Sequence, residues 1–128
     1  MYSCTKWYFL KIGATEAYIP AKNYEEKTGD VDVIAIFENI KTIINVQVKF
    51  YQGETSDWAI TQIKDFSKSK ENMSDGYNRQ YWVISSSDNF SETSYNLAKE
   101  NSIQLINGNQ FVEMLLNTGI ESLDSFEN

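Results

Sequence analysis

Three polar side chains within one stretch of the chain could carry out hydrolytic chemistry together. Asp32 lies in the first half of residues 29–51, and Gln47 and Lys49 lie in the second half. An acid, an amide and a lysine that meet on one face of a β-sheet are typical of sites that cleave phosphodiester bonds with a divalent metal ion. The ion in such a site activates a water molecule and neutralises the charge that develops on the phosphate. We therefore predict that Asp32, Gln47 and Lys49 are catalytic residues.

Two strands joined by a tight turn would bring these side chains together. Residues 44–51 alternate apolar and polar side chains, which indicates a strand with one buried face. If the turn lies at residues 39–40, Asp32 is opposite Gln47 at a Cβ–Cβ distance of about 5 Å. A slip of one residue would turn Asp32 toward the apolar face, so the apolar pattern supports this register. The same register pairs Val31 with Val48, Val33 with Val46, Ala35 with Ile44, and Asp30 with Lys49.

The amino-acid composition limits the kinds of site that the chain can form. The chain has 128 residues, of which 41% are hydrophobic, and this suits one domain with a single core. It contains no histidine and a single cysteine, Cys4, which excludes zinc sites built from His and Cys as well as histidine-based catalytic triads. Any metal ion must therefore be held by oxygen atoms, which favours Mg²⁺ or Mn²⁺ as the cofactor.

The charge of the chain bears on its partners. The net charge is −7, whereas nucleic-acid-binding proteins usually carry a basic surface. The acidity is concentrated toward the end, because residues 100–128 contain five acidic side chains and no lysine or arginine. We expect DNA to bind weakly to this domain alone. A DNA-recognition domain or subunit absent from this chain, or a homodimer, would then supply further affinity.

Cysteine usage and hydropathy predict a cytoplasmic protein with no membrane partner. Cys4 cannot form an internal disulfide, which favours a reducing compartment. No stretch is long and apolar enough to cross a membrane. The apolar residues at 7–12 are interrupted by Lys11 and lack a signal-peptide cleavage pattern.

Hydrophobic patterns along the chain predict a series of strands and helices. Aromatic and branched residues predict a strand at residues 5–12, and residues 13–23 are typical of a loop or irregular hairpin. Asn107 with Gln110 has the spacing of a capping box at a helix start. After the paired strands we expect a helix at 58–69, a strand at 80–86, a helix that begins at Ser91, a strand at 103–106 and a helix that ends near Gly119. This order predicts an α/β fold, a sandwich in which helices flank a central mixed sheet.

The candidate catalytic residues and the second half of the chain resemble a known nuclease family. Asp32 followed by Gln47-Val48-Lys49 is similar to the core of the PD-(D/E)xK nucleases in its QxK variant. The second half of the Mrr-type restriction endonuclease domain has a strand ending in small polar residues, a Phe-Ser helix start, a strand running into a glycine turn and a last helix. Residues 82–115 resemble it, reading WVISSSDNFSETSYNLAKENSIQLINGNQFVEML. The resemblance covers residues 27–116 and implies a restriction-endonuclease-like fold.

The resemblance also implies a role for each residue of the motif. Asp32 would bind the divalent metal ion, Gln47 would give its side-chain oxygen to the same ion or its hydration shell, and the Val48 carbonyl would be a further ligand. Lys49 would position or help to deprotonate the attacking water and steady the charge on the phosphate. The implied function is a Mg²⁺- or Mn²⁺-dependent DNA endonuclease of a restriction or defence system.

One departure from the family weakens the predicted metal site. The common form of the motif has glutamate where this chain has Gln47, so the site has one negative charge fewer. Another carboxylate would compensate, and related families place one on an N-terminal helix, but we expect no helix before residue 29. The upstream candidates are Glu16, Glu25, Glu26 and Asp30.

Three further residues are candidates for contact with the substrate. Lys64 and Lys68 are four residues apart on a predicted helix, and Tyr51 lies at the end of the polar face. Paired lysines on a helix most often form a solvated face, so this interpretation stands beside the functional one.

The sequence leaves the organisation and activity open in two respects. We expect residues 1–26 to pack on a nuclease-like core at 27–119, with a tail at 120–128. The main alternative to a DNA endonuclease is a nuclease-like fold that no longer cuts and instead binds DNA or protein. A further alternative is a structure-selective nuclease such as a junction resolvase.

Overall fold

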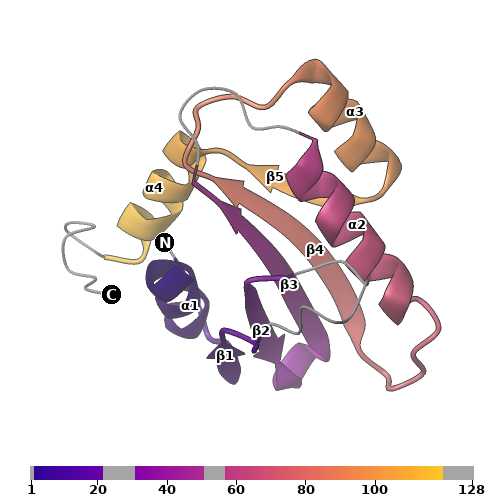
Figure 1. Cartoon of the computed structure of the whole chain (residues 1–128). Helices are drawn as coiled ribbons and strands as arrows, with labels where there is room; N and C mark the ends of the chain where they lie inside the picture. Colours follow the sequence, from indigo (N-terminus) through magenta and orange to yellow (C-terminus); the bar gives the residue numbers. More distant parts are fainter. Residues whose placement is uncertain (1, 22–30, 51–56, 120–128) are drawn as a thin grey trace.

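The protein folds around a mixed five-stranded sheet with helices on both faces (Figure 1). The structure is a computed structural model that describes residues 2–21, 31–50 and 57–119. β2 is antiparallel to β1 and β3, whereas β3, β4 and β5 run parallel. This arrangement confirms the predicted α/β fold. The strands, in spatial order, are β1 (Glu16–Tyr18), β2 (Val33–Phe37), β3 (Thr42–Lys49), β4 (Asn78–Ser85) and β5 (Ile103–Ile106), and the helices are α1 (Tyr2–Lys11), α2 (Trp58–Lys70), α3 (Glu92–Glu100) and α4 (Gly108–Asn117).

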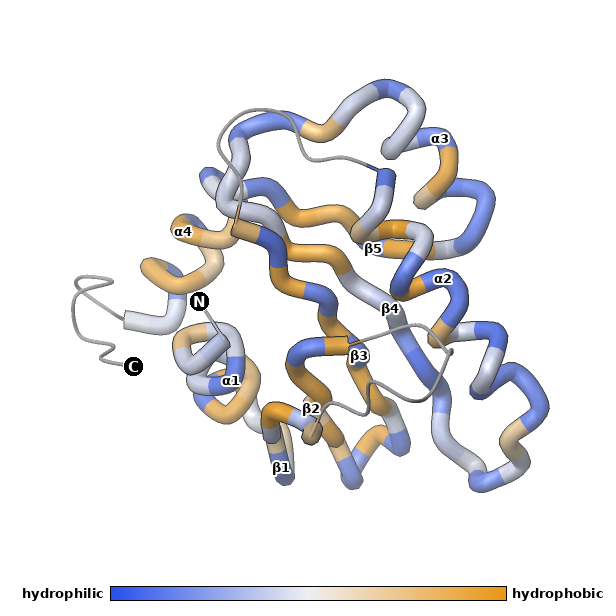
Figure 2. Tube along the Cα trace, in the orientation of Figure 1, coloured by the Kyte–Doolittle hydropathy of each residue, from blue (hydrophilic) through white to orange (hydrophobic). Residues whose placement is uncertain are grey.

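Each face of the sheet has its own apolar core. On one face, α1 and α4 cover a core that includes Phe9, Val46 and Leu115, all fully buried. On the other face, α2 and α3 cover a core that includes Ile60 and Val83. Figure 1 shows α1 and α4 on one side of the sheet and α2 and α3 on the other, and Figure 2 shows hydrophobic and hydrophilic residues alternating along β3. The alternation places polar side chains of β3 on the side of α2 and α3.

The N-terminal segment is a helix, so the strand predicted at residues 5–12 is wrong. Thr5 and Phe9, one helical turn apart on α1, are fully buried, and the Phe9 ring lies 5.4 Å from that of Trp82 between centroids. The aromatic and branched residues of this segment favour a strand locally, but packing against the sheet overrides that preference. The expectation that no helix precedes residue 29 is wrong for the same reason. Residues 13–23, predicted as a loop or irregular hairpin, include β1.

The hairpin of β2 and β3 has the predicted register from Val33 onward. Val33 pairs with Val46, and Ala35 pairs with Ile44. The turn, however, is a 3₁₀ turn over Glu38–Ile40 followed by Lys41 at φ +48°, not a two-residue turn. The apolar faces therefore set the register here, because one buried face admits a single pairing whatever the turn.

Three helices begin at the edge of the sheet where the parallel strands end. α2, α3 and α4 follow β3, β4 and β5 in the chain, so their first turns lie at the carboxyl edge of these strands. Ser91 caps α3 by accepting a hydrogen bond from the Ser94 N–H at 3.0 Å, and the predicted capping box of Asn107 and Gln110 is present at the start of α4. Gly119, at φ +91°, follows the end of α4 as expected. Among the described residues, no helix combines the length and the apolar character that crossing a membrane requires.

Gly108 tests how tightly α4 is joined to the end of β4. Its N–H donates to the Ser87 carbonyl at 2.8 Å, and a Cβ at this position would lie 2.5 Å from the Ser86 carbonyl oxygen. Gly108→Ala should therefore lower the free energy of unfolding by about 1–3 kcal/mol through overpacking. Helix propensity alone predicts the opposite sign, because alanine is a better helix former than glycine.

Urea unfolding of the two proteins measures this difference. Asn109→Ala, at the neighbouring exposed position, is the control and should change stability by no more than about 0.5 kcal/mol. A Gly108→Ala variant that is as stable as the parent protein would contradict the close contact.

Candidate active site

The predicted catalytic residues lie at the edge of the sheet where the parallel strands end. Lys49 is the last residue of β3. Asp32 directly precedes β2, which starts at the same edge because it is antiparallel to β3. In open α/β sheets, ligands bind outside the carboxyl ends of the strands. The three candidates therefore lie where this architecture usually places a functional site.

The ladder between β2 and β3 becomes irregular at Asp32. Val33 is paired with Val46, and the Asp32 N–H also donates to the Val46 carbonyl, at 2.8 Å. Two residues of one strand thus oppose one residue of the other, which is the pattern of a β-bulge. The bulge sends Val31 to the opposite face, where it packs in the core under α2 and α3. The predicted pairing of Val31 with Val48 on one apolar face is therefore wrong.

The Asp32 side chain takes over a hydrogen bond at the point where the ladder ends. Its Oδ2 accepts from the Val48 N–H at 2.7 Å, and Asp32 is only 2% exposed. Because the N–H and C=O of one strand residue point to the same side of the strand, the Val48 carbonyl faces the side on which Asp32 lies. The predicted register paired Asp32 with Gln47, and this pairing is wrong. The Asp32 carboxylate instead lies against Val48, the residue between Gln47 and Lys49.

Gln47 and Lys49 meet at a residue that the sequence did not single out. The Oε1 atom of Gln62, on α2, accepts hydrogen bonds from Gln47 Nε2 at 2.9 Å and from Lys49 Nζ at 3.1 Å. Gln47 is 1% exposed, while Gln62 and Lys49 are partly buried. The two β3 side chains are therefore joined to each other through the helix that covers this face.

One signal in the sequence could have identified Gln62. It lies on the same stripe of α2 as Ala59 and Phe66, next to Ile63, and the buried residues of the helix include Ala59 and Ile63. A long polar side chain within the inward-facing stripe of an amphipathic helix needs a hydrogen-bonding partner inside. The predicted strand offers Gln47 and Lys49 on its polar face, so the partner could have been sought there.

Among the described residues, none of the upstream acids lies beside the predicted catalytic residues or Gln62. Glu16 pairs with Ile36, four residues along β2 from Asp32, which corresponds to about 13 Å at the rise of a strand. A helix does precede these residues, α1, but it contains no Asp or Glu. Glu25, Glu26 and Asp30 lie outside the described residues.

The candidates for substrate contact are not part of the cluster at Gln62. Lys64 and Lys68 lie on α2 and are partly buried and exposed, respectively. At about 100° per residue they point roughly 200° and 240° around the helix from Gln62, away from β3. Tyr51 lies outside the described residues. Contact of these side chains with a substrate stays a prediction.

The oxygen atoms of Asp32, Gln47 and Val48 are of the kind that a hard divalent cation prefers as ligands. Asp32 has a carboxylate, Gln47 an amide oxygen, and Val48 a backbone carbonyl on the side of Asp32. Across residues 2–21, 31–50 and 57–119, no three His, Cys, Asp or Glu side chains are grouped so that they could hold a metal ion. Mg²⁺ tolerates this shortage, since it retains several water ligands and is commonly bound through one or two carboxylates together with substrate phosphate.

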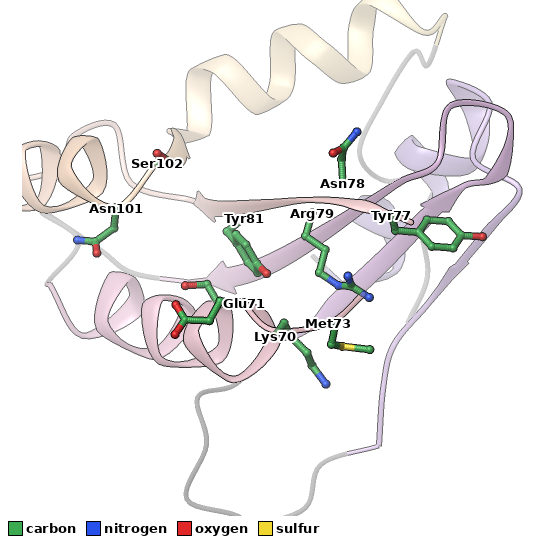
Figure 3. Close-up of a pocket in the computed structure, with 10 residues that line it drawn as sticks. Lys70, Glu71, Met73, Tyr77, Asn78, Arg79, Tyr81, Asn101 and Ser102 are labelled. Carbon is green, nitrogen blue, oxygen red and sulfur yellow. The ribbon is translucent and has the colours of Figure 1, made fainter. Parts of the chain in front are cut away.

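A pocket of about 360 Å³ lies at the opposite end of the sheet (Figure 3). Arg79, which lines it, pairs with Ile43 in the ladder, six residues before Lys49 and thus about 20 Å from it. The Arg79 guanidinium donates two hydrogen bonds to the Asp75 carboxylate, at 2.5 and 3.1 Å, and these bonds, together with one from the Tyr77 N–H, lower the pKa of Asp75 to about 2. The guanidinium of Arg79 is thus already paired with an acid, and the pocket is remote from the predicted catalytic residues.

Comparison with known proteins identifies a family and several similar folds. The family model Mrr_cat, described as restriction endonuclease, matches residues 7–115. A repair endonuclease from Pyrococcus abyssi has a TM-score of 0.56 at 16% identity, covering 82% of this chain and 45% of its own. A protein of unknown function, AF1548, has a TM-score of 0.64 at 15% identity, covering 99% of this chain and 70% of its own. Protein VC1899 from Vibrio cholerae has a TM-score of 0.57 at 12% identity, covering 92% of this chain and 31% of its own.

These likenesses bear on the fold. At identities of 12–16% the solved structures share the architecture of this chain, which spans less than half the length of the repair endonuclease and of VC1899. No curated protein matches the chain in sequence.

The hydrogen bond between Asp32 and Val48 makes a prediction about stability. In Asp32→Ala the buried Val48 N–H loses its carboxylate acceptor, which should lower the free energy of unfolding by about 1–3 kcal/mol. Asp32→Asn retains an oxygen that can accept the same hydrogen bond, so its loss should be less than half as large. Urea unfolding of the two variants checks this order. Equal stability of Asp32→Ala and the parent protein would show that the hydrogen bond contributes little.

Proposed function

This chain belongs to the Mrr_cat family of restriction endonucleases, and we propose that it cleaves DNA with the help of a divalent cation, Mg²⁺ or Mn²⁺. The observation that carries the proposal is the position of the Asp32 carboxylate on the Val48 N–H, between Gln47 and Lys49 in sequence. The acid thereby lies against the backbone of Val48, between the residues that supply the amide and the lysine. The family alone makes the chain a nuclease of the restriction-endonuclease-like type.

In the proposed site, the groups that would hold the cation come from two directions around β3, the side of β2 and the face toward α2. Asp32 and the Val48 carbonyl, on the side of β2, and the amide oxygen of Gln47 would hold the cation. When bound, the cation would lower the pKa of a water molecule and offset the charge of the phosphate. The burial of Asp32 and Gln47, at 2% and 1% exposure, keeps their side chains in fixed positions before the substrate arrives.

Lys49 supplies the positive charge of the proposed site. Its ammonium group donates to Gln62 Oε1 at 3.1 Å. The hydrogen bond to Gln62 fixes the position of the ammonium, which would donate to a phosphate oxygen or to the attacking water when the substrate is bound. In this role Lys49 steadies the charge that develops on the phosphate, as preorganised donors do in other hydrolytic sites.

The proposal includes a source of affinity beyond this chain. With a net charge of −7, the domain lacks the electrostatic attraction that usually holds DNA. A DNA-recognition domain or subunit, or a second copy of the chain, would supply it. Within the proposal the biological setting is a restriction or defence system, in keeping with the family description.

Two other functions have specific support. Gln47 in place of glutamate, together with the acidic charge, favours a nuclease-like module that binds DNA or protein without cutting. A repair endonuclease has a similar fold, and a nuclease that selects DNA by structure, such as a junction resolvase, is a further candidate. Comparing the cleavage of four-way junctions with that of linear duplexes separates this last function from sequence-directed cleavage.

Plasmid cleavage tests the proposed catalytic residues. Asp32→Asn and Lys49→Met should each lower the rate of nicking in the presence of Mg²⁺ or Mn²⁺ by about 100-fold or more, because each removes a charge that acts on the reacting phosphate or on its metal ion. Chelation of the metal with EDTA should abolish the activity of the parent protein.

Glu16→Gln is the matched control for Asp32→Asn, since it removes one carboxylate from β1, beside Ile36 and remote from Asp32. It should cleave at the rate of the parent protein. Equal rates in the parent protein, Asp32→Asn and Lys49→Met would reject the assignment of the site, and a parent protein that never cuts would favour the binding module.

A further inference from the structure

We infer that Gln62 is a positioning residue that turns the amide oxygen of Gln47 toward the proposed metal ion. The inference rests on the proposed function and adds a residue from α2 to the motif on β3. It begins from two hydrogen bonds to the same atom, Gln62 Oε1, from Gln47 at 2.9 Å and from Lys49 at 3.1 Å.

The chemistry of these two contacts determines the orientation of both amides. A lysine ammonium has donors and no acceptor, so the Gln62 atom that it contacts must be the oxygen and not the nitrogen. That oxygen in turn needs a donor from Gln47, so the Gln47 atom at 2.9 Å must be its NH₂ group. The carbonyl oxygen of Gln47, on the other branch of the planar amide, is therefore directed away from Gln62.

This orientation matters because Gln47 stands where the common form of the motif has glutamate. Either oxygen of a carboxylate can face a cation, whereas an amide has one oxygen, and its NH₂ group repels a cation. Without a partner, the two orientations of an amide differ little in their own energy. Gln62 removes the wrong orientation, because a flipped Gln47 would place its oxygen against the oxygen of Gln62.

Gln62 is well placed to hold this orientation. Its helix is anchored by Ala59, Ile60 and Ile63, each with no exposed surface. A side chain on a packed helix fixes its partner more closely than one on a loop. The ammonium of Lys49 contacts the same Gln62 oxygen, so a cation–amide–amide chain links both catalytic candidates on β3.

Binding of Mn²⁺ distinguishes positioning from mere structural support. Calorimetry would compare four proteins: the parent, Gln62→Met, Gln47→Glu, and the double variant. Gln62→Met should weaken Mn²⁺ binding about tenfold when residue 47 is glutamine, as the loss of an outer-shell partner does in other metal sites. In the Gln47→Glu background the same change should weaken binding by no more than about twofold, because a carboxylate needs no orienting partner.

Ser67→Ala is the matched control on the same helix, because its hydroxyl donates to the Lys64 carbonyl and does not take part in the contacts of Gln47. It should bind Mn²⁺ as the parent protein does. An equal loss from Gln62→Met in both backgrounds would overturn the inference, since it would mean that Gln62 only supports the local structure.

A measurement without metal decides the orienting role independently of the proposed function. In the metal-free protein, NMR of the Gln47 side-chain NH₂ group should show slow hydrogen exchange that becomes at least about tenfold faster in Gln62→Met, because the donor loses its buried acceptor. An unchanged exchange rate would overturn the inference. If none of the four proteins binds Mn²⁺, the metal-dependent function fails, and with it the cation that Gln47 is inferred to face.

Discussion

The hydrogen bond from the Val48 N–H to the Asp32 carboxylate is the constraint on which the candidate site depends. Beyond Val33 the backbone ladder between β2 and β3 stops, and a buried N–H at that point would otherwise lack a ladder acceptor. The bulge at Asp32 brings a side chain into that position. The irregularity that ends the sheet is thus the same feature that places a carboxylate beside the Gln47-Val48-Lys49 segment.

The two faces of β3 perform different tasks. Val46 and Val48 are buried under α1 and α4, and this apolar face fixes the register of the hairpin. Gln47 and Lys49 face α2, where each donates a hydrogen bond to Gln62 Oε1. A single strand therefore carries both the residues that make the sheet stable and the residues that are candidates for chemistry, and a slip in register would destroy both at once.

The sequence predicted the parts that depend on local periodicity. The β2–β3 register from Val33 onward, the capping box at Asn107 and the order of elements after β3 all follow from apolar patterns and end signals. It did not predict α1, because the strand preference of its residues is overridden by packing against the distant Trp82. The bulge at Asp32 was missed because it breaks the regular alternation on which the predicted register rests, and the contact of Gln62 with Gln47 was missed because the helix and the strand were considered separately.

With glutamine at position 47, cation binding depends on how the side-chain amide is oriented and less on negative charge. A carboxylate attracts a cation in either orientation, but an amide must be held, so the surrounding structure has to supply rigidity. The structure of α2 meets this requirement beyond Gln62 itself. The first residue before the helix, Asp57, accepts hydrogen bonds from Ser94 Oγ at 2.6 Å and Ser91 Oγ at 3.4 Å, which ties the start of α2 to the start of α3. These hydrogen bonds join the two helices on this face at their first turns. The helix that carries Gln62, and so holds the Gln47 amide, is therefore fixed both by its buried apolar residues and at its start.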